Sequence, residues 1–192
     1  MKKQPEKTAL TKAALTTAFW ELYKDKPITK ISIKDITDRA GYYRSTFYFY
    51  FSDVYAILEQ IEDDILKNWE LMISEVLEQG KQELLLGMVT AFYERNGEYM
   101  SVLLSPNGDP TFQQKIKDTM RPKMFSQFMS SDKDVKMLMI FEFMISGVLA
   151  YITEWYRNAK HISAKDAVIL LQTLASESIA TVMFRHAFSV AE

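Results

Sequence analysis

The chain has 192 residues, of which 48% are hydrophobic and 25% charged, with a formal net charge of −2. This apolar content is too high for a disordered chain, and the length allows a substantial buried core. There is no cysteine and there are only two histidines, so disulfides, thiol nucleophiles and Cys-based zinc sites are excluded and histidine catalysis is poorly supplied. We therefore expect neither an enzyme nor a bound metal or other cofactor. The polar N-terminus lacks the apolar stretch of a secretory signal, and a cytoplasmic location is expected.

Charge is divided unevenly along the chain. Residues 1–54 hold ten basic and six acidic side chains, a net charge of +4, whereas the remaining residues carry −6. A basic N-terminal part on an acidic body would orient the chain on a polyanion such as DNA. A difference of this size also arises by chance, so charge alone does not decide the partner.

Turn residues and capping patterns divide the chain into about nine helices. Pro5 can begin the first helix and Pro27 ends it. Ser32, with Asp35 three residues later, has the form of a capping box, and Gly41 can end the short helix that follows. No segment alternates as a strand does, so we expect an all-α fold, with Pro122 kinking or splitting its helix. The predicted helices are 5–26, 33–40, 44–51, 53–79, 81–95, 98–104, 110–128, 132–158 and 164–188.

One apolar run raises the question of a membrane. Residues 137–152 are apolar except for Glu142. The run is shorter than the roughly 18 to 20 residues that a bilayer span needs, and it contains a charge. We expect a buried or interface helix and no membrane association.

The helices 33–40 and 44–50, joined by a tight turn at 41–43, have the form of a helix-turn-helix. The second helix carries Arg44 and several hydroxyl groups but no acidic residue. These side chains suit base edges and phosphates in a major groove about 12 Å wide. Short helix pairs are common, so the pattern alone is weak.

The stretch 31–51 resembles the DNA-binding region of the TetR/AcrR family of bacterial transcriptional regulators. The resemblance rests on Ala40-Gly41 before the turn, on the Ser-Thr-Phe-Tyr run 45–48, and on Tyr50-Phe51 leading into the next helix. It implies a three-helix DNA-binding domain, residues 1–52, and a six-helix ligand-binding and dimerisation domain, residues 53–192. It further implies a dimeric regulator of double-stranded DNA with a palindromic operator, most often a repressor released by a small apolar ligand.

The candidate DNA contacts combine family position with side-chain chemistry. Arg44 is expected to read a guanine, because Arg pairs with its O6 and N7 atoms, although a solvated surface Arg is the alternative. Ser32, Thr46 and Tyr48 are assigned to phosphates, while Phe47 and Phe51 are expected in the core. The full set of expected DNA contacts is Ser32, Lys34, Tyr42, Tyr43, Arg44, Ser45, Thr46, Tyr48 and Tyr50.

Two positions depart from the family pattern. Tyr43 stands where the family usually has a Ser or Thr that caps the recognition helix and reaches phosphate. Val54 stands where the family usually has a phosphate-binding Lys, and Asp53 beside it repels phosphate. An alternative function follows: a helical protein with weakened DNA binding that regulates through a protein partner.

Methionines and aromatic residues are frequent after residue 68. A plain helical core explains them, and the family resemblance points instead to an apolar ligand cavity. Glu142 is the candidate polar anchor, with pairing to Arg157 or Arg185, to a partner subunit, or exposure to water as alternatives. The expected ligand-binding residues are Trp69, Met72, Met88, Phe92, Met100, Phe112, Met124, Phe128, Glu142, Tyr151 and Trp155.

The last two predicted helices, 132–158 and 164–188, have the features of a dimer interface. Apolar residues occur all round the first of them, more than one core-facing side requires. Small residues in the second allow close approach, so two helices from each subunit would form a four-helix bundle. Packing within one chain is the alternative.

Overall fold

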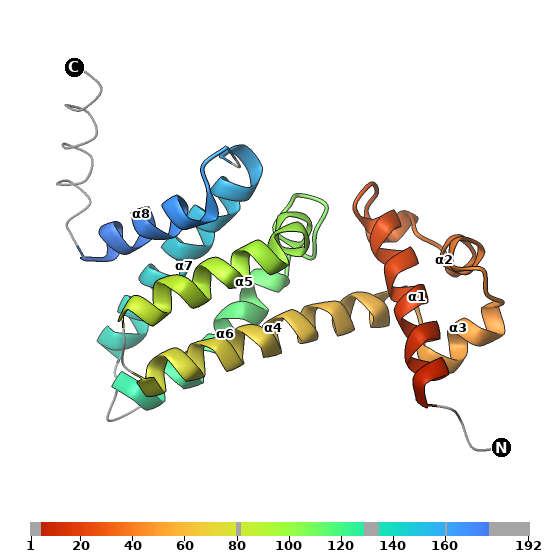
Figure 1. The fold of residues 1–192 in the computed structure, drawn as a ribbon, viewed down its shortest axis with the longest axis horizontal. Coiled ribbons are helices and arrows are strands. Elements are labelled where there is room, and N and C mark those ends of the chain that lie inside the picture. Colours follow the sequence, from red (N-terminus) through yellow and green to blue (C-terminus); the bar gives the residue numbers. More distant parts are fainter. Residues whose placement is uncertain (1–4, 80–81, 129–134, 160, 177–192) are drawn as a thin grey trace. The chain divides into compact units, whose positions relative to one another are not determined.

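The computed structural model describes residues 5–79, 82–128, 135–159 and 161–176. These described residues form α-helices and one short 3-10 helix without any strand, so the all-α prediction is confirmed (Figure 1). The elements are α1 (Pro5–Tyr23), η1 (Ile28–Lys30), α2 (Ile33–Ala40), α3 (Arg44–Tyr50), α4 (Val54–Gln79), α5 (Gln82–Leu103), α6 (Phe112–Phe128), α7 (Val135–Asn158) and α8 (Ala164–Ser176).

The chain divides into two compact units, Met1–Lys67 with Val102–Phe112, and Asn68–Ser101 with Gln113–Glu192. In the first unit, α1, α2 and α3 pack together with the beginning of α4 and the α5–α6 loop. The boundary expected after residue 52, between a DNA-binding and a ligand-binding domain, stays a prediction. The compact unit that contains α1–α3 also includes the beginning of α4. The fully buried side chains of this unit include Leu15, Phe19, Tyr23, Ile36, Phe47, Ile57 and Phe112.

Aromatic rings connect α4, α5 and α7 in the second unit. The ring centroids of Trp69 and Phe92 are 5.5 Å apart, and those of Tyr93 and Trp155 are 6.0 Å apart. Trp155 and Tyr156 lie 4.6 Å apart. Burial raises the pKa of Tyr93 and Tyr156 well above the ordinary value of a tyrosine. Offset and edge-to-face pairs of this kind stabilise a core beyond the burial of their area.

Side chains of α7 hold α8 in place. The Tyr151 hydroxyl donates to the Ala167 carbonyl at 2.8 Å, and Trp155 Nε1 donates to the Ile162 carbonyl at 3.0 Å. Ser163 caps α8 by accepting a hydrogen bond from the Asp166 backbone N–H at 3.1 Å. The polar ends of both aromatic residues are therefore used within this unit.

The predicted break at Asn96-Gly97 is wrong: a single helix, α5, spans both positions instead of the two helices 81–95 and 98–104. The buried Asn96 side chain donates to the Phe92 carbonyl one turn earlier at 2.9 Å, so it does not support a turn. Gly97 provides space, because a Cβ atom there would lie 3.5 Å from Cε1 of Tyr156. Tertiary packing therefore keeps Asn96 and Gly97 inside a continuous helix.

Other predicted boundaries had different outcomes. α6 runs through Pro122 as one helix, so the proline does not split it. The breaks expected at Gly80 and at 130–131 lie outside the described residues, and so does the part of helix 164–188 beyond Ser176.

The described part of the chain contains one helix, Leu138–Asn158, that is long and apolar enough to cross a membrane by length and composition. Only 17% of that window is buried within the chain. The exposed large apolar side chains of α7 lie in its first half: Val135, Met139, Ile140, Phe143 and Met144. The first half of α7 therefore presents apolar surface that no other described part of the chain covers.

Candidate nucleic-acid interface

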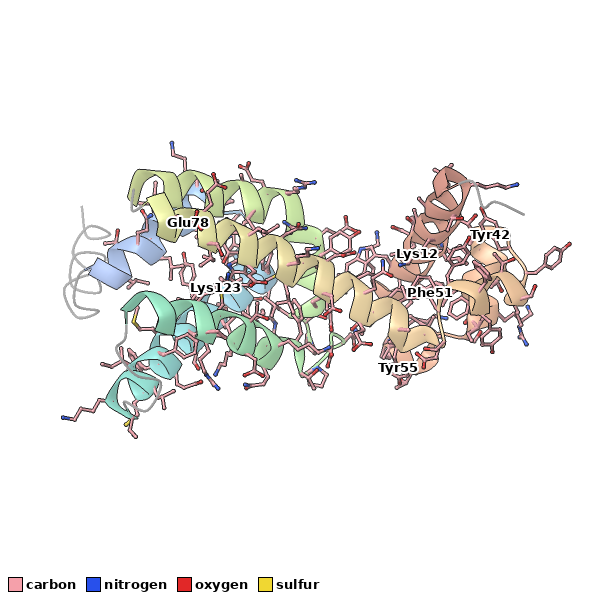
Figure 2. All side chains as sticks on the ribbon, turned by 90° about the horizontal axis from the view of Figure 1, so that it is seen from below. Lys12, Tyr42, Phe51, Tyr55, Glu78 and Lys123 are labelled. Atoms are coloured by element: carbon pink, nitrogen blue, oxygen red, sulfur yellow. The ribbon has the colours of Figure 1, made fainter. Side chains whose placement is uncertain are left out.

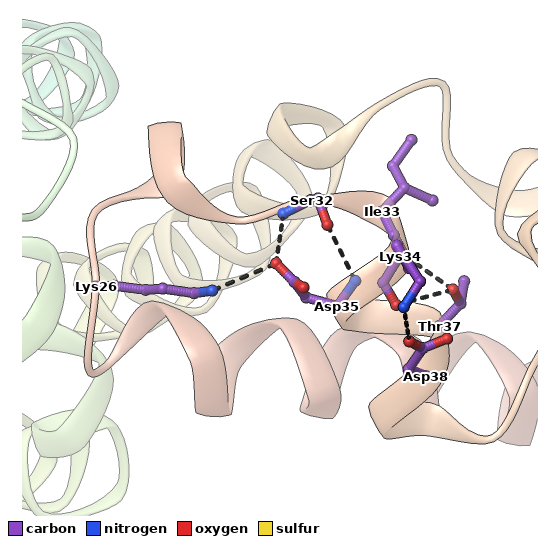
Figure 3. Close-up of polar contacts among 7 residues, drawn as sticks. All are labelled: Lys26, Ser32, Ile33, Lys34, Asp35, Thr37 and Asp38. Atoms are coloured by element: carbon purple, nitrogen blue, oxygen red, sulfur yellow. Dashed lines mark hydrogen bonds and ion pairs between the residues drawn. The ribbon is translucent and has the colours of Figure 1, made fainter.

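The start of α2 is held by the predicted capping box (Figure 3). The Asp35 backbone N–H donates to Ser32 Oγ at 3.1 Å, and the Ser32 backbone N–H donates to Asp35 Oδ2 at 3.0 Å. Lys26 Nζ donates to the same carboxylate oxygen at 3.3 Å. These hydrogen bonds, above all the one from the Ser32 backbone, hold the pKa of Asp35 below its ordinary value. Ser32 is thus a helix cap, and its phosphate contact remains a prediction.

The turn between α2 and α3 depends on Gly41, which has a φ of 73° in the left-handed region. In this conformation the N–H groups of Gly41 and Tyr42 both reach the Thr37 carbonyl, the latter at 3.0 Å. Only glycine adopts such a backbone without a steric penalty, so the predicted helix end is confirmed at this residue. The turn sets the direction in which α3 leaves α2.

Tyr43 is the N-cap residue of α3, and its side chain makes no capping hydrogen bond. The side chain is 84% exposed. The absence of a hydroxyl cap agrees with the departure noted in the sequence. The ring extends into solvent at the end of the helix where DNA contacts are expected.

One face of α3 is anchored in the core and the opposite face is exposed. Phe47 is fully buried, with its ring 5.7 Å from that of Phe51. The Lys12 ammonium of α1 lies over the Phe51 ring, 5.6 Å from its centroid (Figure 2). The predicted core role of both phenylalanines is confirmed. Because they fix the helix from behind, the other face of α3 is held outward as a rigid surface.

The predicted DNA contacts differ in their exposure. Ser32, Lys34, Tyr43, Arg44, Ser45 and Tyr48 are exposed, whereas Tyr42, Thr46 and Tyr50 are half-buried. Lys34 Nζ donates to Asp38 Oδ2 at 2.7 Å, and this hydrogen bond raises the pKa of Lys34. A phosphate would have to compete with Asp38 for that ammonium group.

The start of α4 shows why Val54 departs from the family pattern. Asp53 is the helix cap, since its Oδ1 accepts a hydrogen bond from the Ala56 backbone N–H at 2.9 Å. Val54 is 8% exposed and belongs to the core. An apolar core residue therefore occupies the position where the family has a phosphate-binding lysine.

Phe49 is an exposed residue of α3 that the sequence reasoning missed. Its side chain is 56% exposed, on the side of the helix opposite Phe47. The helical period could have identified it, because residues two positions apart lie on nearly opposite faces of a helix.

The residues expected to bind a ligand do not gather around one described pocket. Trp69, Met72, Phe92 and Met100 are buried in the second unit, and Phe112 is buried in the first. The side chains of Met88, Met124 and Phe128 lie outside the described part of the structure. A small apolar pocket, about 220 Å³ including space open to solvent, contains Tyr151 and Trp155 from the predicted set. Its lining is Tyr93, Tyr151, Ile152, Trp155, Ala164, Ala167, Val168 and Leu171.

Glu142 is an ion-pair residue between α6 and α7. Its two carboxylate oxygens accept hydrogen bonds from Lys117 Nζ at 3.0 Å and from Arg121 at 2.9 Å. These contacts, with Lys117 first, hold the pKa of Glu142 below its ordinary value. The observed partners differ from Arg157 and Arg185, which the sequence suggested. Among the described residues, no cluster of acidic and histidine side chains is arranged to hold a metal ion.

Comparison with known proteins adds independent information. A family model of the TetR class, described as the C-terminal region of transcriptional regulators, matches residues 81–177, which is half of the chain. The HTH-type transcriptional regulator EthR of Mycobacterium tuberculosis is 29% identical over 94 residues, 47% of this chain and 43% of that protein. The match thus spans less than half the length of these relatives.

Two solved structures share the fold. A TetR transcriptional regulator from Streptococcus agalactiae superposes with a TM-score of 0.62 at 20% identity, covering 89% of this chain and 96% of the other. The TetR-family repressor FadR of Thermus thermophilus, in complex with lauroyl-CoA, gives a TM-score of 0.50 at 16% identity, covering 88% and 94%. The exposed helix-turn-helix, the shared fold and the matched C-terminal region together identify the chain as a member of the TetR family of transcriptional regulators.

Proposed function

We propose that this regulator binds double-stranded DNA through α3 placed in the major groove. The exposed face of α3 carries this proposal: it presents Arg44, Ser45 and Tyr48 to solvent, while Phe47 anchors the helix behind them. The α3 sequence contains no carboxylate that would repel phosphate. A helix of this kind combines base readout with backbone contacts, as major-groove recognition requires.

Selection from a randomised duplex library with the full-length protein tests this function. We expect an enriched palindromic sequence, and an affinity for it that falls steeply with salt, because phosphate contacts release counterions. Fluorescence anisotropy at several salt concentrations measures both properties. Failure to enrich any sequence at low salt would refute DNA binding by this chain.

We infer that the exposed apolar surface of α7 is covered by a second copy of the chain. Its exposed residues Met139, Ile140, Phe143 and Met144 follow helical spacing, and exposed Ala150 continues the same stripe. An apolar surface of this length on a non-membrane protein is typical of a subunit interface. A two-fold dimer would also present two recognition helices to the two half-sites of a palindrome.

The substitution Phe143→Glu tests the interface, since this side chain is 73% exposed. We expect the variant to sediment as a monomer at concentrations at which the wild type is a dimer. Leu71→Glu is the matched control, because Leu71 is 61% exposed on a different helix, α4. A wild-type monomer that floats with lipid vesicles would instead assign the α7 surface to a membrane.

For the regulatory function we propose repression that a small apolar ligand relieves. The buried aromatic residues Trp69, Phe92, Tyr93 and Trp155 support a site in the second unit, and FadR, which has the same fold, binds lauroyl-CoA. The enclosed space of this pocket is only about 10 Å³, far below the roughly 300 Å³ at which ligand sites begin, so binding would require the helices to move apart. A reporter gene placed behind the selected operator gives the direction of regulation: transcription should rise when the gene for this protein is deleted.

Tryptophan fluorescence and thermal unfolding with a panel of fatty acids, acyl-CoAs and aromatic compounds would identify the ligand class. In variants that keep a single tryptophan, Trp69 and Trp155 report from the second unit and Trp20 from the first, so the variant whose emission changes locates the site. A compound that shifts the emission of Trp69 or Trp155 should also lower the affinity of the protein for its operator. A compound that binds without changing operator affinity would contradict its role as inducer.

Regulation through a protein partner is the second candidate function. Two residues favour it: the exposed Tyr43, whose side chain does not cap α3, and the buried Val54. Both stand where the family normally has a side chain that contacts phosphate. This function predicts weak DNA binding by the chain alone and a strong increase on addition of the partner. Nanomolar binding by the isolated protein at physiological salt would argue against it.

A further inference from the structure

Phe49 has a position on α3 that the expected DNA contacts do not explain. Its side chain is 56% exposed, whereas Phe47, two residues earlier, is fully buried. Since successive helical residues are rotated by about 100°, Ser45 and Phe49 both point away from the core, one turn apart. Phe49 therefore lies on the exposed face of α3, beside Ser45 and on the side of the helix opposite the buried Phe47.

The chemistry of the ring limits what it can contact there. Phenylalanine has no donor for a phosphate oxygen or for the acceptors N7 and O6 of guanine. The apolar feature of the major groove is the C5-methyl group of thymine, and aromatic side chains contact it favourably. Tyr50 packs edge-on against the Phe49 ring at a centroid distance of 5.0 Å, which restricts the ring's orientation.

We propose that Phe49 is a specificity-determining residue that contacts a thymine methyl group in each half-site of the operator. This inference rests on the proposed DNA-binding function. The small neighbour Ser45 allows the ring to approach the base edges, and Arg44 stands at the start of the same helix to contact an adjacent base. The combination predicts a half-site in which a thymine occupies a fixed position near a guanine.

The test uses the duplex selected by the full-length wild-type protein, with each thymine replaced in turn by deoxyuridine. This exchange removes only the methyl group. We expect one position in each half-site at which the exchange weakens wild-type binding about fourfold, the effect of removing one methyl group from an apolar contact. Exchange in both half-sites together should weaken binding by about fifteenfold, since distant contacts add.

Variants connect the methyl group to the residue. In Phe49→Ala the same deoxyuridine exchange should have no further effect, whereas Phe49→Leu, which retains an apolar side chain, should keep part of it. Tyr55→Ala is the matched control, because Tyr55 is also 56% exposed, belongs to the same compact unit and lies on α4 (Figure 2). This control should retain the full fourfold effect. Circular dichroism checks that each variant is folded.

Two results would overturn the proposal in different ways. If no deoxyuridine position affects wild-type binding, or if the effect persists unchanged in Phe49→Ala, the residue does not read a methyl group although the chain binds DNA. If the wild type selects no sequence, the DNA-binding function itself fails and this inference fails with it.

Discussion

Replacing Gly97 by alanine tests whether α5 is one continuous helix. A glycine inside a helix is less favourable than alanine by about 1 kcal/mol, because the glycine backbone loses more freedom on folding. The added Cβ would lie 3.5 Å from Cε1 and 3.7 Å from the hydroxyl oxygen of Tyr156, which are ordinary van der Waals distances. We therefore expect Gly97→Ala to raise the free energy of unfolding by about 0.5–1 kcal/mol, or the unfolding temperature by about 1–4 °C.

The assay is thermal and urea unfolding at one fixed protein concentration, since association would otherwise shift the midpoint. Far-UV circular dichroism reports all helices, while tryptophan fluorescence of variants that keep a single tryptophan reports on Trp20 in the first unit or on Trp69 or Trp155 in the second. The increase should appear in the second unit, to which Gly97 belongs.

Gly41→Ala is the matched control with the opposite expected sign. A Cβ at Gly41 would meet nothing within 4 Å, so the substitution tests backbone conformation alone. At a φ of 73° an alanine costs about 1–2 kcal/mol. If Gly97→Ala were as destabilising as Gly41→Ala, Gly97 would adopt a left-handed conformation and the turn expected from the sequence would exist after all.

Four further substitutions test the interface and the second unit. Arg44→Ala should lower affinity for the selected duplex by about 1–3 kcal/mol and relax one base preference per half-site, which fluorescence anisotropy measures. The control Arg39→Ala, at another exposed arginine, should relax no base preference. Asp53→Asn keeps a good helix cap but removes a negative charge beside the DNA, so affinity for operator and random DNA should rise at low salt, and an unchanged affinity would place Asp53 away from phosphate. Glu142→Gln should lower the free energy of unfolding by up to about 1 kcal/mol at neutral pH. Because the pKa of Glu142 is lowered in the folded protein, this stability difference between wild type and variant should disappear as the pH falls below 4.5, the ordinary pKa of a glutamate. Trp69→Ala should change the response to an inducing ligand more than operator affinity without ligand, and an intact induction curve would exclude Trp69 from the ligand site.

The sequence predicted the DNA-binding part with most success, because its structure depends on local interactions. The capping box of Ser32 and Asp35 and the left-handed Gly41 each involve groups within five residues of one another. Such interactions favour the same conformation in almost any context. The helix-turn-helix and its position in the chain could therefore be predicted without tertiary information.

The second unit was predicted less well, because its structure depends on contacts between distant residues. Asn96-Gly97 is a strong turn pattern locally, yet Tyr156, some sixty positions away, packs against it in a continuous helix. Glu142 was the candidate polar anchor of a ligand site, with Arg157 or Arg185 as possible ion-pair partners, and it pairs with Lys117 and Arg121 on another helix. Neither partner can be identified from the residues beside it in the sequence.

By itself, the sequence determined the all-α class, the helix-turn-helix and the chemistry available on the recognition helix, because helical period and capping are short-range properties. Only the tertiary structure decided which of those side chains are presented to a partner. It buried Val54, engaged Lys34 with Asp38, and left Phe49 and the α7 stripe exposed. Exposure depends on what packs against a residue from elsewhere in the chain, and that information is absent from any local pattern.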